Sequence, residues 1–532
     1  MQNNFGRVFS RRGAFCFFII MLLFLSCILR IAVITASNYA DVQQRQNSYR
    51  ISVGKPRGTI YDCNMFPITN SKSKILAAVS PTPRAITSIS NILSGEELES
   101  VLESLKSGKP TVCELPEIID VDGITCTTVY QHNSFETPAI HLIGYTDVDS
   151  HGVSGLEIAY DDILYSDKDI SFVYTVNGHG SVLDGIKPTV ENNTSAVADG
   201  VVSTIDLKIQ TIVEEIANSI ETGAIIIAEP YTSKIRACVS RPNFDCTKIV
   251  DFLNAENSPL LNRAINSYNV GSIFKPCVAA AGIENGKIEY IYNCVGSCEI
   301  TNRNFKCHDS DGHGILNLKS AIANSCNTFF YNFAFSVGKD SIYKMASSLG
   351  FGKKLTICEN ITASAGNLPN TDRLANIAQL ANFSIGQGEL LLSPISMLNL
   401  YCSIATDGKY YVPSIVEGTL KDGSFEKYDI GSPTRVMSAE TAGILRECLK
   451  AVVEEGTGIY AKPRTVTAAG KTATAQTGKY ENGEEINEGW FCGFFPAEKP
   501  EYVAVIFSEN TKKQSKTNNE IFAEIADRIS SL

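Results

Sequence analysis

A chain of 532 residues is too long for one ordinary domain, so two or three domains are expected. Charged residues make up 19% of the sequence and apolar residues 44%, a balance typical of folded proteins rather than disordered ones. The formal net charge of −11 argues against a nucleic-acid-binding protein, because such proteins carry a basic surface for phosphates.

The N-terminus predicts a membrane anchor over residues 1–36. Three arginines lie within the first twelve residues, residues 13–29 carry no charge, and a short apolar stretch follows Arg30. This length suffices to span a bilayer, with the Arg30 side chain reaching the interface. The arginines predict a cytoplasmic N-terminus and an extracellular location for the rest. A cleaved signal peptide is the alternative, disfavoured by the long run and by Arg30.

Residues 37–197 predict a second domain of mixed structure. A polar helical stalk is expected at 39–50, followed by short strands, by turns and by a charged helix from near Ser94 to Lys106. The four histidines of this region are isolated in the sequence, so structural or solvated roles are expected for them. No metal or nucleophile pattern is recognised here.

Residues 198–532 predict an α+β domain. Strand patterns occur at both ends of this region, at 224–228, 235–239, 465–476, 490–495 and 502–507. A helix is expected from Thr204 to Ile220 and another through Ile529, and the middle, from about 287 to 460, is expected to be mostly helical. An antiparallel sheet covered by helices is the natural arrangement for this pattern.

Ser272 lies at a predicted helix start. A glycine precedes it, an alanine-rich run follows it, and Pro276 falls in the first turn, where its missing N–H costs little. Lys275 is three positions on, so the two side chains share one face of the helix. A lysine at the positive end of the helix dipole loses its proton more easily, and a neutral lysine beside a serine is a base beside a nucleophile. The same spacing recurs elsewhere in the chain, for example at Ser71/Lys74, Ser336/Lys339, Ser341/Lys344 and Ser424/Lys427, so this motif alone is weak.

Two further segments carry candidate chemistry. Ser325 and Asn327 are two positions apart between two predicted helices, so both can face one cleft, although helix capping explains them equally well. Lys471 lies in a strand of small residues and threonines that can offer N–H groups, hydroxyls and one charge to a ligand, although an ordinary edge strand has the same pattern.

A histidine base is not expected for Ser272. After residue 200 only His308 and His313 occur, and both lie in a cysteine-rich stretch. The base for a nucleophilic serine is therefore expected to be a lysine.

The three motifs occur in a characteristic order: Ser-x-x-Lys, then Ser-x-Asn, then Lys-Thr-small. Together they resemble the signature of penicillin-binding proteins and serine β-lactamases. The chain is similar to class B penicillin-binding proteins, which are monofunctional peptidoglycan D,D-transpeptidases. Nearly everything after residue 36 takes part in the resemblance, including the landmarks at 57–62, 152–157, 204–206, 262–264, 386–388, 455–458 and 490–493. It implies a membrane anchor, a pedestal (dimerisation-type) domain and a transpeptidase domain, divided at residues 36 and 197.

The resemblance implies how bonds are made and broken. Ser272 attacks the carbonyl of the penultimate D-Ala of a stem peptide, Lys275 takes the serine proton, and the terminal D-Ala leaves. Ser325 with Lys471 relays a proton toward the leaving amine. An amine from a neighbouring stem peptide then resolves the acyl-enzyme.

The resemblance also implies how the substrate is held. Asn327 holds the substrate amide, Thr472 and Thr474 grip the terminal carboxylate, and the N–H groups of Ser272 and Thr474 form the oxyanion hole. No cofactor is implied for catalysis. The implied partners are stem peptides, β-lactams and a membrane glycosyltransferase of the wall-synthesis complex, and no nucleic acid.

Two departures from the family pattern stand out. Ala473 replaces the glycine that usually ends the third motif, and its methyl group is expected to weaken or alter acylation by bulky β-lactams while leaving the fold intact. Cys63 and Met65 replace an arginine and a glycine near Asp62. A catalytically weakened scaffold of the wall-synthesis complex is therefore the alternative function.

Cysteine and histidine crowd into residues 294–326, a composition that suits a structural zinc ion. Some class B transpeptidases carry such a zinc beside the second motif, and the resemblance implies the ligands Cys294, Cys307, His313 and Cys326. Cys298 or His308 could replace one of these ligands. A Cys294–Cys307 disulfide is the alternative. The cysteines in apolar segments, at 238, 277, 402, 448 and 492, are expected to be small core residues.

Other serine acylases of this signature fit less well. A class A type β-lactamase needs a Glu-x-x-Leu-Asn segment, which we do not find between the second and third motifs. A membrane β-lactam sensor needs several spans, and a bifunctional synthase needs a glycosyltransferase domain before residue 200. Whether the protein serves division, elongation or sporulation is not determined by the sequence.

Overall fold

The computed structural model describes residues 2–36, 47–183, 185–192, 194–481 and 483–532. Contacts group the chain into two compact units, each made of separate segments. The first unit comprises residues 1–56, 73–129 and 167–193, and the second comprises 57–72, 130–166 and 194–532. Because compact units need not coincide with domains, the division of the chain at residues 36 and 197 stays a prediction.

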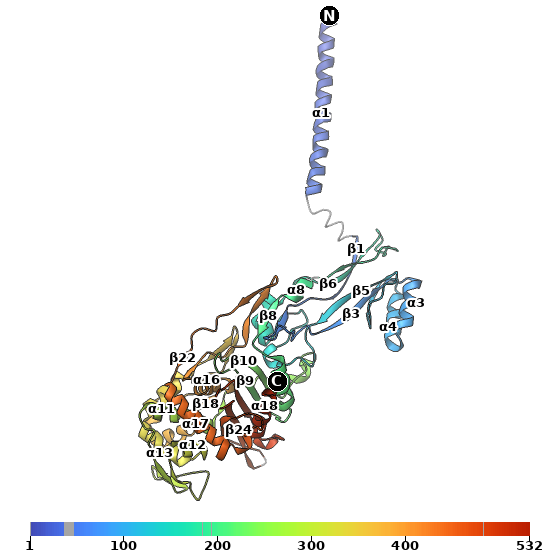
Figure 1. Ribbon diagram of the computed structural model, residues 1–532. Coiled ribbons are helices and arrows are strands. Elements are labelled where there is room, and N and C mark those ends of the chain that lie inside the picture. The colour runs from blue at the N-terminus through green and yellow to red at the C-terminus, as the bar shows by residue number, and fades with distance from the viewer. Residues whose placement is uncertain (1, 37–46, 184, 193, 482) are drawn as a thin grey trace. The chain divides into compact units, whose positions relative to one another are not determined.

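The N-terminal segment is one long helix, α1 (Gln2–Ala36) (Figure 1). Its stretch Arg12–Thr35 is long and apolar enough to cross a membrane, judged by length and composition. The stalk expected at 39–50 lies mostly outside the described residues. Its last residues are not helical but begin strand β1 (Ser48–Gly54), because alternate side chains from Tyr49 onward pack into a sheet core.

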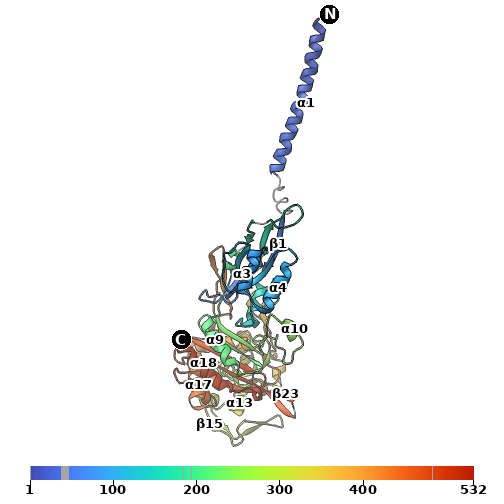
Figure 2. The same ribbon diagram turned by 90° about the vertical axis from the view of Figure 1, so that its right-hand side faces the viewer.

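The first unit contains two three-stranded sheets and two helices. The sheets have the orders β1–β6–β7 and β4–β3–β5, with β3 (Lys72–Val79), β4 (Thr111–Leu115), β5 (Ile124–Gln131), β6 (Ile170–Thr175) and β7 (Thr189–Glu191). The two helices are α3 (Pro83–Ile92) and α4 (Gly95–Leu105), which are labelled in Figure 2. Their buried side chains share one core with alternate residues of β3, and α4 confirms the charged helix expected after Ser94.

The centre of the second unit is a five-stranded antiparallel sheet with the order β10–β9–β25–β24–β23. Its strands are β9 (Gly223–Ala228), β10 (Ile235–Arg241), β23 (Ala469–Glu481), β24 (Glu484–Phe495) and β25 (Tyr502–Ser508). The strands predicted from the two ends of this region thus meet in one sheet. The α+β prediction is confirmed.

Helices cover both faces of this sheet, and β25 shows how. Val503, Val505 and Phe507 belong to one buried cluster, whereas Ala504 and Ile506 belong to another, as the period of two requires. The smaller cluster is closed by α9 (Leu207–Ala217) and α18 (Asn518–Ile529). The larger one is closed by α11 (Lys275–Glu284), α16 (Pro394–Ala405), α17 (Ala439–Glu455) and their neighbours (Figure 1).

The middle of the chain is helical but not only helical. Its other helices are α12 (Leu318–Ala323), α13 (Asn327–Val337), α14 (Lys339–Ser348) and α15 (Ile377–Ser384). Two-stranded ribbons lie between them: β12 (Tyr292–Cys294) with β15 (Gly314–Leu316), β13 (Ser297–Ile300) with β14 (Arg303–Lys306), and β16 (Leu355–Cys358) with β17 (Ile361–Ala363). Strands this short show no recognisable period of two, which is why an all-helical insert was expected.

Short elements complete the second unit. A four-stranded sheet has the order β2–β8–β20–β21, with β2 (Thr59–Tyr61), β8 (Gly200–Ser203), β20 (Val416–Lys421) and β21 (Ser424–Lys427). Two-residue ribbons pair β11 (Tyr268–Asn269) with β18 (Leu391–Leu392) and β19 (Lys409–Tyr410) with β22 (Thr434–Arg435). The remaining short helices are α5 (Ile140–Ile143), α6 (Gly155–Ala159), α7 (Asp161–Leu164), α8 (Thr194–Ala198) and α10 (Ile249–Phe252).

A buried ionic network holds the N-terminal segments of the second unit together. Arg57 Nε donates to Glu157 Oε2 over 2.7 Å, and His132 Nε2 lies 2.6 Å from Glu157 Oε1. Burial alone would raise the pKa of Glu157, but His132 and Arg57 lower it below its usual value. His132 thus has the structural role expected from its isolation in the sequence.

Candidate active site

Ser272 lies in a tight turn against the edge strand of the central sheet. Its turn is a 3-10 helix, Gly271–Phe274, that continues into α11 at Lys275, so the predicted helix start is confirmed with a tighter first turn. Gly271 has a φ of +58°, and a side chain there would approach the Cβ atoms of Ala473 and Ala475 to 3.3 Å. The glycine therefore lets the nucleophile turn pass close to β23.

Lys275 brings the first and second motifs together. Its ammonium donates to the Ser325 carbonyl over 2.7 Å, to the Ser325 hydroxyl over 3.1 Å and to Asn327 Oδ1 over 2.8 Å. The side chain is fully buried, and burial lowers the pKa of Lys275 to about 7, although the nearby thiols of Cys326 and Cys307 act in the opposite direction. Within the described residues the Ser272 hydroxyl makes no hydrogen bond, so the serine is not tied to another partner.

The second motif forms a sharp turn between α12 and α13. Ser325 has a φ of +51°, which is unusual for a residue other than glycine, and its N–H donates to the Ile322 carbonyl over 3.1 Å. The cap of α13 is Cys326, whose sulfur accepts from the Phe329 N–H over 3.4 Å. Ser325 is therefore not the N-cap, and its hydroxyl is directed to Lys275 instead.

The third motif lies on β23, whose outer edge is not paired with another strand of the sheet. Lys471 is fully buried, and its ammonium donates to the Thr472 carbonyl over 3.1 Å and lies 3.5 Å from Thr457 Oγ1. Burial lowers the pKa of Lys471 far below its usual value, and the charge of Lys275 lowers it further. Two lysines in one buried site favour a state in which at least one of them is neutral.

Residues 472–474 differ in what they face. The Thr472 hydroxyl is 3.1 Å from that of Thr457, and Thr474 is exposed. Ala473 is only 8% exposed and lies opposite Trp490 in the sheet register, with its methyl group toward Gly271. The methyl group is thus directed to the nucleophile turn rather than into solvent.

Comparison with known proteins identifies the domain that carries these motifs. Residues 223–527 match the family described as the penicillin binding protein transpeptidase domain. The chain belongs to the penicillin-binding protein transpeptidase family. This confirms the family expected from the order of the three motifs.

The chain is also similar to individual curated proteins whose names are consistent with this family. The chain is 27% identical over 439 residues to stage V sporulation protein D of Bacillus subtilis, covering 77% of this chain and 65% of that protein. It is 29% identical over 321 residues to the peptidoglycan D,D-transpeptidase MrdA of Acinetobacter baumannii, covering 54% and 48% respectively. The chain thus spans about two thirds and about half the length of these two relatives.

The fold is shared with solved members of the family. The crystal structure of penicillin-binding protein 3 from Mycobacterium tuberculosis in complex with aztreonam superposes with a TM-score of 0.65 at 22% identity. The match covers 90% of this chain and 96% of that one. At this level of identity the likeness shows the fold, and it includes segments on both sides of the residue 223 boundary.

A cysteine–histidine cluster lies beside the second motif. The ligand atoms of Cys294, Cys307, His313 and Cys326, the four predicted ligands, all lie within 4.8 Å of one another. His313 Nδ1 is 3.6 Å from the sulfurs of both Cys294 and Cys307. Three thiols and one imidazole at this spacing fit the tetrahedral coordination of zinc.

The chemistry of the cluster also fits a metal ion. The thiols of Cys307 and Cys326 are 3.8 Å apart, and this contact lowers the pKa of Cys307 and raises that of Cys326. The Thr328 hydroxyl donates to Cys294 over 3.0 Å, a contact that stabilises a thiolate. All sixteen cysteines are free, so the alternative Cys294–Cys307 disulfide is not formed. The five cysteines expected in the core are buried.

Residues that the sequence analysis did not single out also contact the motifs. Thr457, noted only as part of a landmark, contacts Lys471 and Thr472. The Tyr401 hydroxyl donates to the Ile273 carbonyl over 3.1 Å from within the buried helix α16. No motif in the sequence marked this contact.

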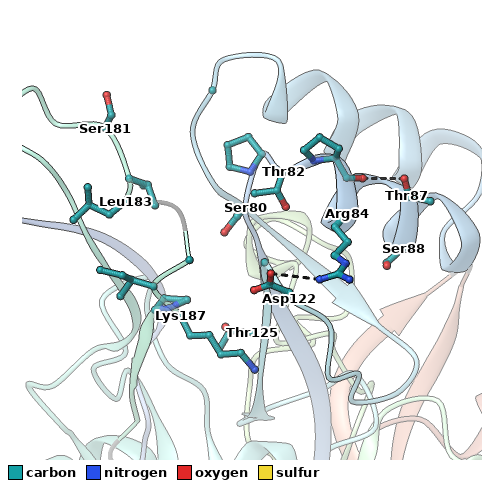
Figure 3. Close-up of a pocket in the computed structure, with 18 residues that line it drawn as sticks. Ser80, Thr82, Arg84, Thr87, Ser88, Asp122, Thr125, Ser181, Leu183 and Lys187 are labelled. Carbon is teal, nitrogen blue, oxygen red and sulfur yellow. Dashed lines mark hydrogen bonds and ion pairs between the residues drawn. The ribbon is translucent and has the colours of Figure 1, made fainter.

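A cavity of about 780 Å³ lies in the first unit and is separate in its lining from this site. Figure 3 shows Arg84 beside Asp122, with their charged groups 3.8 Å apart, together with Ser80 and Lys187. None of the predicted catalytic residues lines it. Its polar side chains resemble an ordinary solvated surface, so it does not enter the proposed function.

Proposed function

We propose that the protein is a peptidoglycan D,D-transpeptidase that cross-links stem peptides through an acyl-enzyme on Ser272. The observation that carries this proposal is the set of contacts of Lys275. Lys275 is buried, has a pKa of about 7 and follows Ser272 by three positions. Its ammonium donates to both polar residues of the second motif, Ser325 and Asn327. The family membership supports the reaction class.

The proposed reaction begins with acylation. Lys275 takes the hydroxyl proton of Ser272, whose oxygen attacks the carbonyl of the penultimate D-Ala. The N–H groups of Ser272 and Thr474 stabilise the oxyanion. The C–N bond then breaks, and the terminal D-Ala leaves as an amine that receives a proton through Ser325 and Lys471.

Deacylation forms the cross-link. The amine of a neighbouring stem peptide attacks the ester carbonyl, and the ester bond to Ser272 breaks as the new amide bond forms. The proton lost by the amine returns to the serine oxygen.

Asn327 holds the substrate amide, and Thr472 with Thr474 holds the terminal carboxylate before acylation. A β-lactam acylates the same serine, but its leaving nitrogen stays attached to the product.

We further propose that a structural zinc ion is bound by Cys294, Cys307, His313 and Cys326. Such an ion would take no part in the reaction but would fix the loop that bears Ser325 and Asn327, because Cys326 lies between them. Full-length protein purified without chelators should contain one zinc per chain. A variant with Cys294→Ser should lose it, whereas Cys277→Ser, a buried cysteine of α11, should keep it. Absence of zinc from the unsubstituted protein would reject the site.

We also propose that α1 anchors the protein in the cell membrane as a single span. The N-terminus would be cytoplasmic, and the transpeptidase domain would lie outside, where its substrate is assembled. A membrane glycosyltransferase that polymerises the glycan strands would be its partner. The apolar stretch Arg12–Thr35 and the arginines before it support this arrangement.

Fluorescent penicillin provides the direct test of the reaction. The full-length protein in detergent should be labelled covalently, and the label should resist denaturation because it is an ester. Ser272→Ala should not be labelled, whereas Ser336→Ala, at one of the other Ser-x-x-Lys matches, should be labelled normally. A folded wild-type protein that takes no label would favour the alternative, a scaffold with weakened catalysis.

A further inference from the structure

The segment that leads into the nucleophile turn is held on two sides. Strand β11 pairs with β18, so that Tyr268 lies opposite Leu392 and Asn269 opposite Leu391. It also contacts side chains from the middle of strand β24 (Glu484–Phe495). Only Val270 and Gly271 separate Asn269 from Ser272, so any shift of β11 is passed on to the serine within three residues.

Two side chains of β24 bind both peptide groups of Asn269. Its N–H donates to Glu488 Oε2 over 2.9 Å, and its carbonyl accepts from Trp490 Nε1 over 2.8 Å. Glu488 is 7% exposed and Trp490 is 1% exposed. A buried two-point attachment of this kind fixes both the position and the orientation of the peptide.

Glu488 and Trp490 also flank Gly489, the β24 residue that lies opposite Thr474 of β23. In the antiparallel register Trp490 lies opposite Ala473, Glu488 lies opposite Ala475, and Gly489 between them lies opposite Thr474. The two proposed oxyanion donors, the N–H groups of Ser272 and Thr474, are therefore both held by a three-residue stretch of β24. Residues 488–490 reach the Ser272 N–H through the hydrogen bonds to Asn269, and they reach the Thr474 N–H through the pairing of β24 with β23.

We propose that Glu488 and Trp490 are positioning residues that hold the nucleophile turn at the correct distance from β23 for the oxyanion hole. This inference rests on the proposed acylation of Ser272. Neither residue touches the substrate in this proposal; both act through Asn269. Misplacement of catalytic groups by about 1 Å costs on the order of a hundredfold in rate, so such an attachment matters for acylation.

The surroundings of Glu488 add a pH dependence. Burial raises the pKa of Glu488 to about 7, with the Asn269 hydrogen bond and Lys479 acting to lower it and Glu509 acting to raise it. Glu509 itself lies 2.9 Å from Arg263 Nε. Above about pH 7 the carboxylate is ionised and is the stronger acceptor for the Asn269 N–H; below that pH the neutral acid is a weaker one.

Protons can reach this carboxyl group from solvent. Glu488 lines a cavity of about 690 Å³ together with Tyr268, Thr477 and Glu509. Titration of Glu488 in the folded protein is therefore expected. Protonation of Glu488 would slow acylation below neutral pH, and this effect would add to that of the protonation of Lys275.

The test compares acylation rates of full-length protein in detergent with fluorescent penicillin. Glu488→Ala removes the acceptor and should slow acylation by roughly 10- to 100-fold. Glu488→Gln keeps an acceptor oxygen and should stay within about threefold of the wild type. Trp490→Phe removes the second attachment and should also slow the reaction. Glu484→Ala, an exposed residue of the same strand, is the control and should change nothing.

The pH profile separates positioning from a general loss of structure. Below pH 7 the wild-type rate should fall more steeply than that of Glu488→Gln, in which residue 488 no longer titrates. An acylation rate of Glu488→Ala equal to that of the wild type would overturn the inference. Equal slowing of the Ala and Gln variants, with parallel pH profiles, would also overturn it. If Glu488→Ala does not fold, the Gln profile and the Trp490→Phe rate decide. Absence of label from the wild type would instead reject the proposed function itself.

Discussion

Lys275 shows how burial could let an ordinary lysine serve as the proposed base. Its ordinary pKa of 10.5 would leave almost every chain protonated at neutral pH, whereas burial lowers the pKa to about 7. Only the neutral form can accept the serine proton. The side chains of Ser325 and Asn327 accept hydrogen bonds from the Lys275 ammonium.

We therefore expect acylation to rise with pH through about 7. Because the folded-state pKa is depressed, the active neutral form dominates above this value and falls about tenfold per pH unit below it. Stopped-time labelling with fluorescent penicillin between pH 5 and pH 9 measures the profile. Lys275→Arg keeps the charge but cannot supply a base, so its labelling should fall by roughly 100-fold or more at every pH. A profile flat across this range would contradict the assignment.

Ala473 is the second prediction at this scale. Its methyl group faces Gly271, so its bulk acts on the spacing between β23 and the nucleophile turn. Ala473→Gly should speed acylation by β-lactams with bulky side chains several-fold and leave the melting temperature nearly unchanged. Benzylpenicillin, which is smaller, serves as the matched comparison. Unchanged rates for the bulky compounds would show that the methyl group has no effect.

How much of the site could be predicted depends on how local its signals are. Ser272, Lys275 and Ser325 follow from three short motifs in order, and Lys275 does contact Ser325. Glu488 carried no such signal, because its partner Asn269 is 219 positions away in the sequence and the contact exists only once β24 and β11 meet. The direction of the Ala473 methyl group was likewise hidden, since it depends on which face of β23 meets the nucleophile turn.

At the scale of elements, length decides what a sequence pattern reveals. The helix α4 and the strand β25 were predicted close to their observed bounds because apolar residues recur over two or more turns or repeats. The ribbon β12–β15, with three residues in each strand, gives no period to recognise. It lies next to the cysteine cluster, because Cys294 ends β12 and His313 precedes β15, and the four members of that cluster were predicted from composition and family resemblance.

Helix α16 supplies a prediction about stability. It lies in the core with the Tyr401 hydroxyl bonded to the Ile273 carbonyl, next to the nucleophile. Tyr401→Phe removes only this donor and leaves a buried carbonyl with one partner fewer, so the free energy of unfolding should fall by about 1 to 2 kcal/mol. Urea denaturation of the full-length protein in detergent measures it. Tyr460→Phe, an exposed tyrosine, should have no effect, and an equal loss there would argue against the buried hydrogen bond as the cause.

At the scale of the whole molecule, the arginines before the apolar stretch of α1 underlie the proposed topology. The proposed reaction uses a substrate outside the cytoplasmic membrane, and Arg7, Arg11 and Arg12 lie on the N-terminal side of the apolar stretch. Arginines on the cytoplasmic side orient a first span. The proposed orientation of the span would therefore place the active site outside the cytoplasm.

We expect alkaline phosphatase fused to the C-terminus to be active in a bacterial host, because this enzyme folds only outside the cytoplasm, and to stay in the membrane fraction. Replacing Arg7, Arg11 and Arg12 by glutamine removes the orienting charges and should lower the phosphatase activity at equal protein level. Replacing Arg50, which lies beyond the span, is the control and should leave it unchanged. Activity released into the soluble extracytoplasmic fraction would show that the segment is cleaved like a signal peptide, and an inactive wild-type fusion would reverse the proposed orientation.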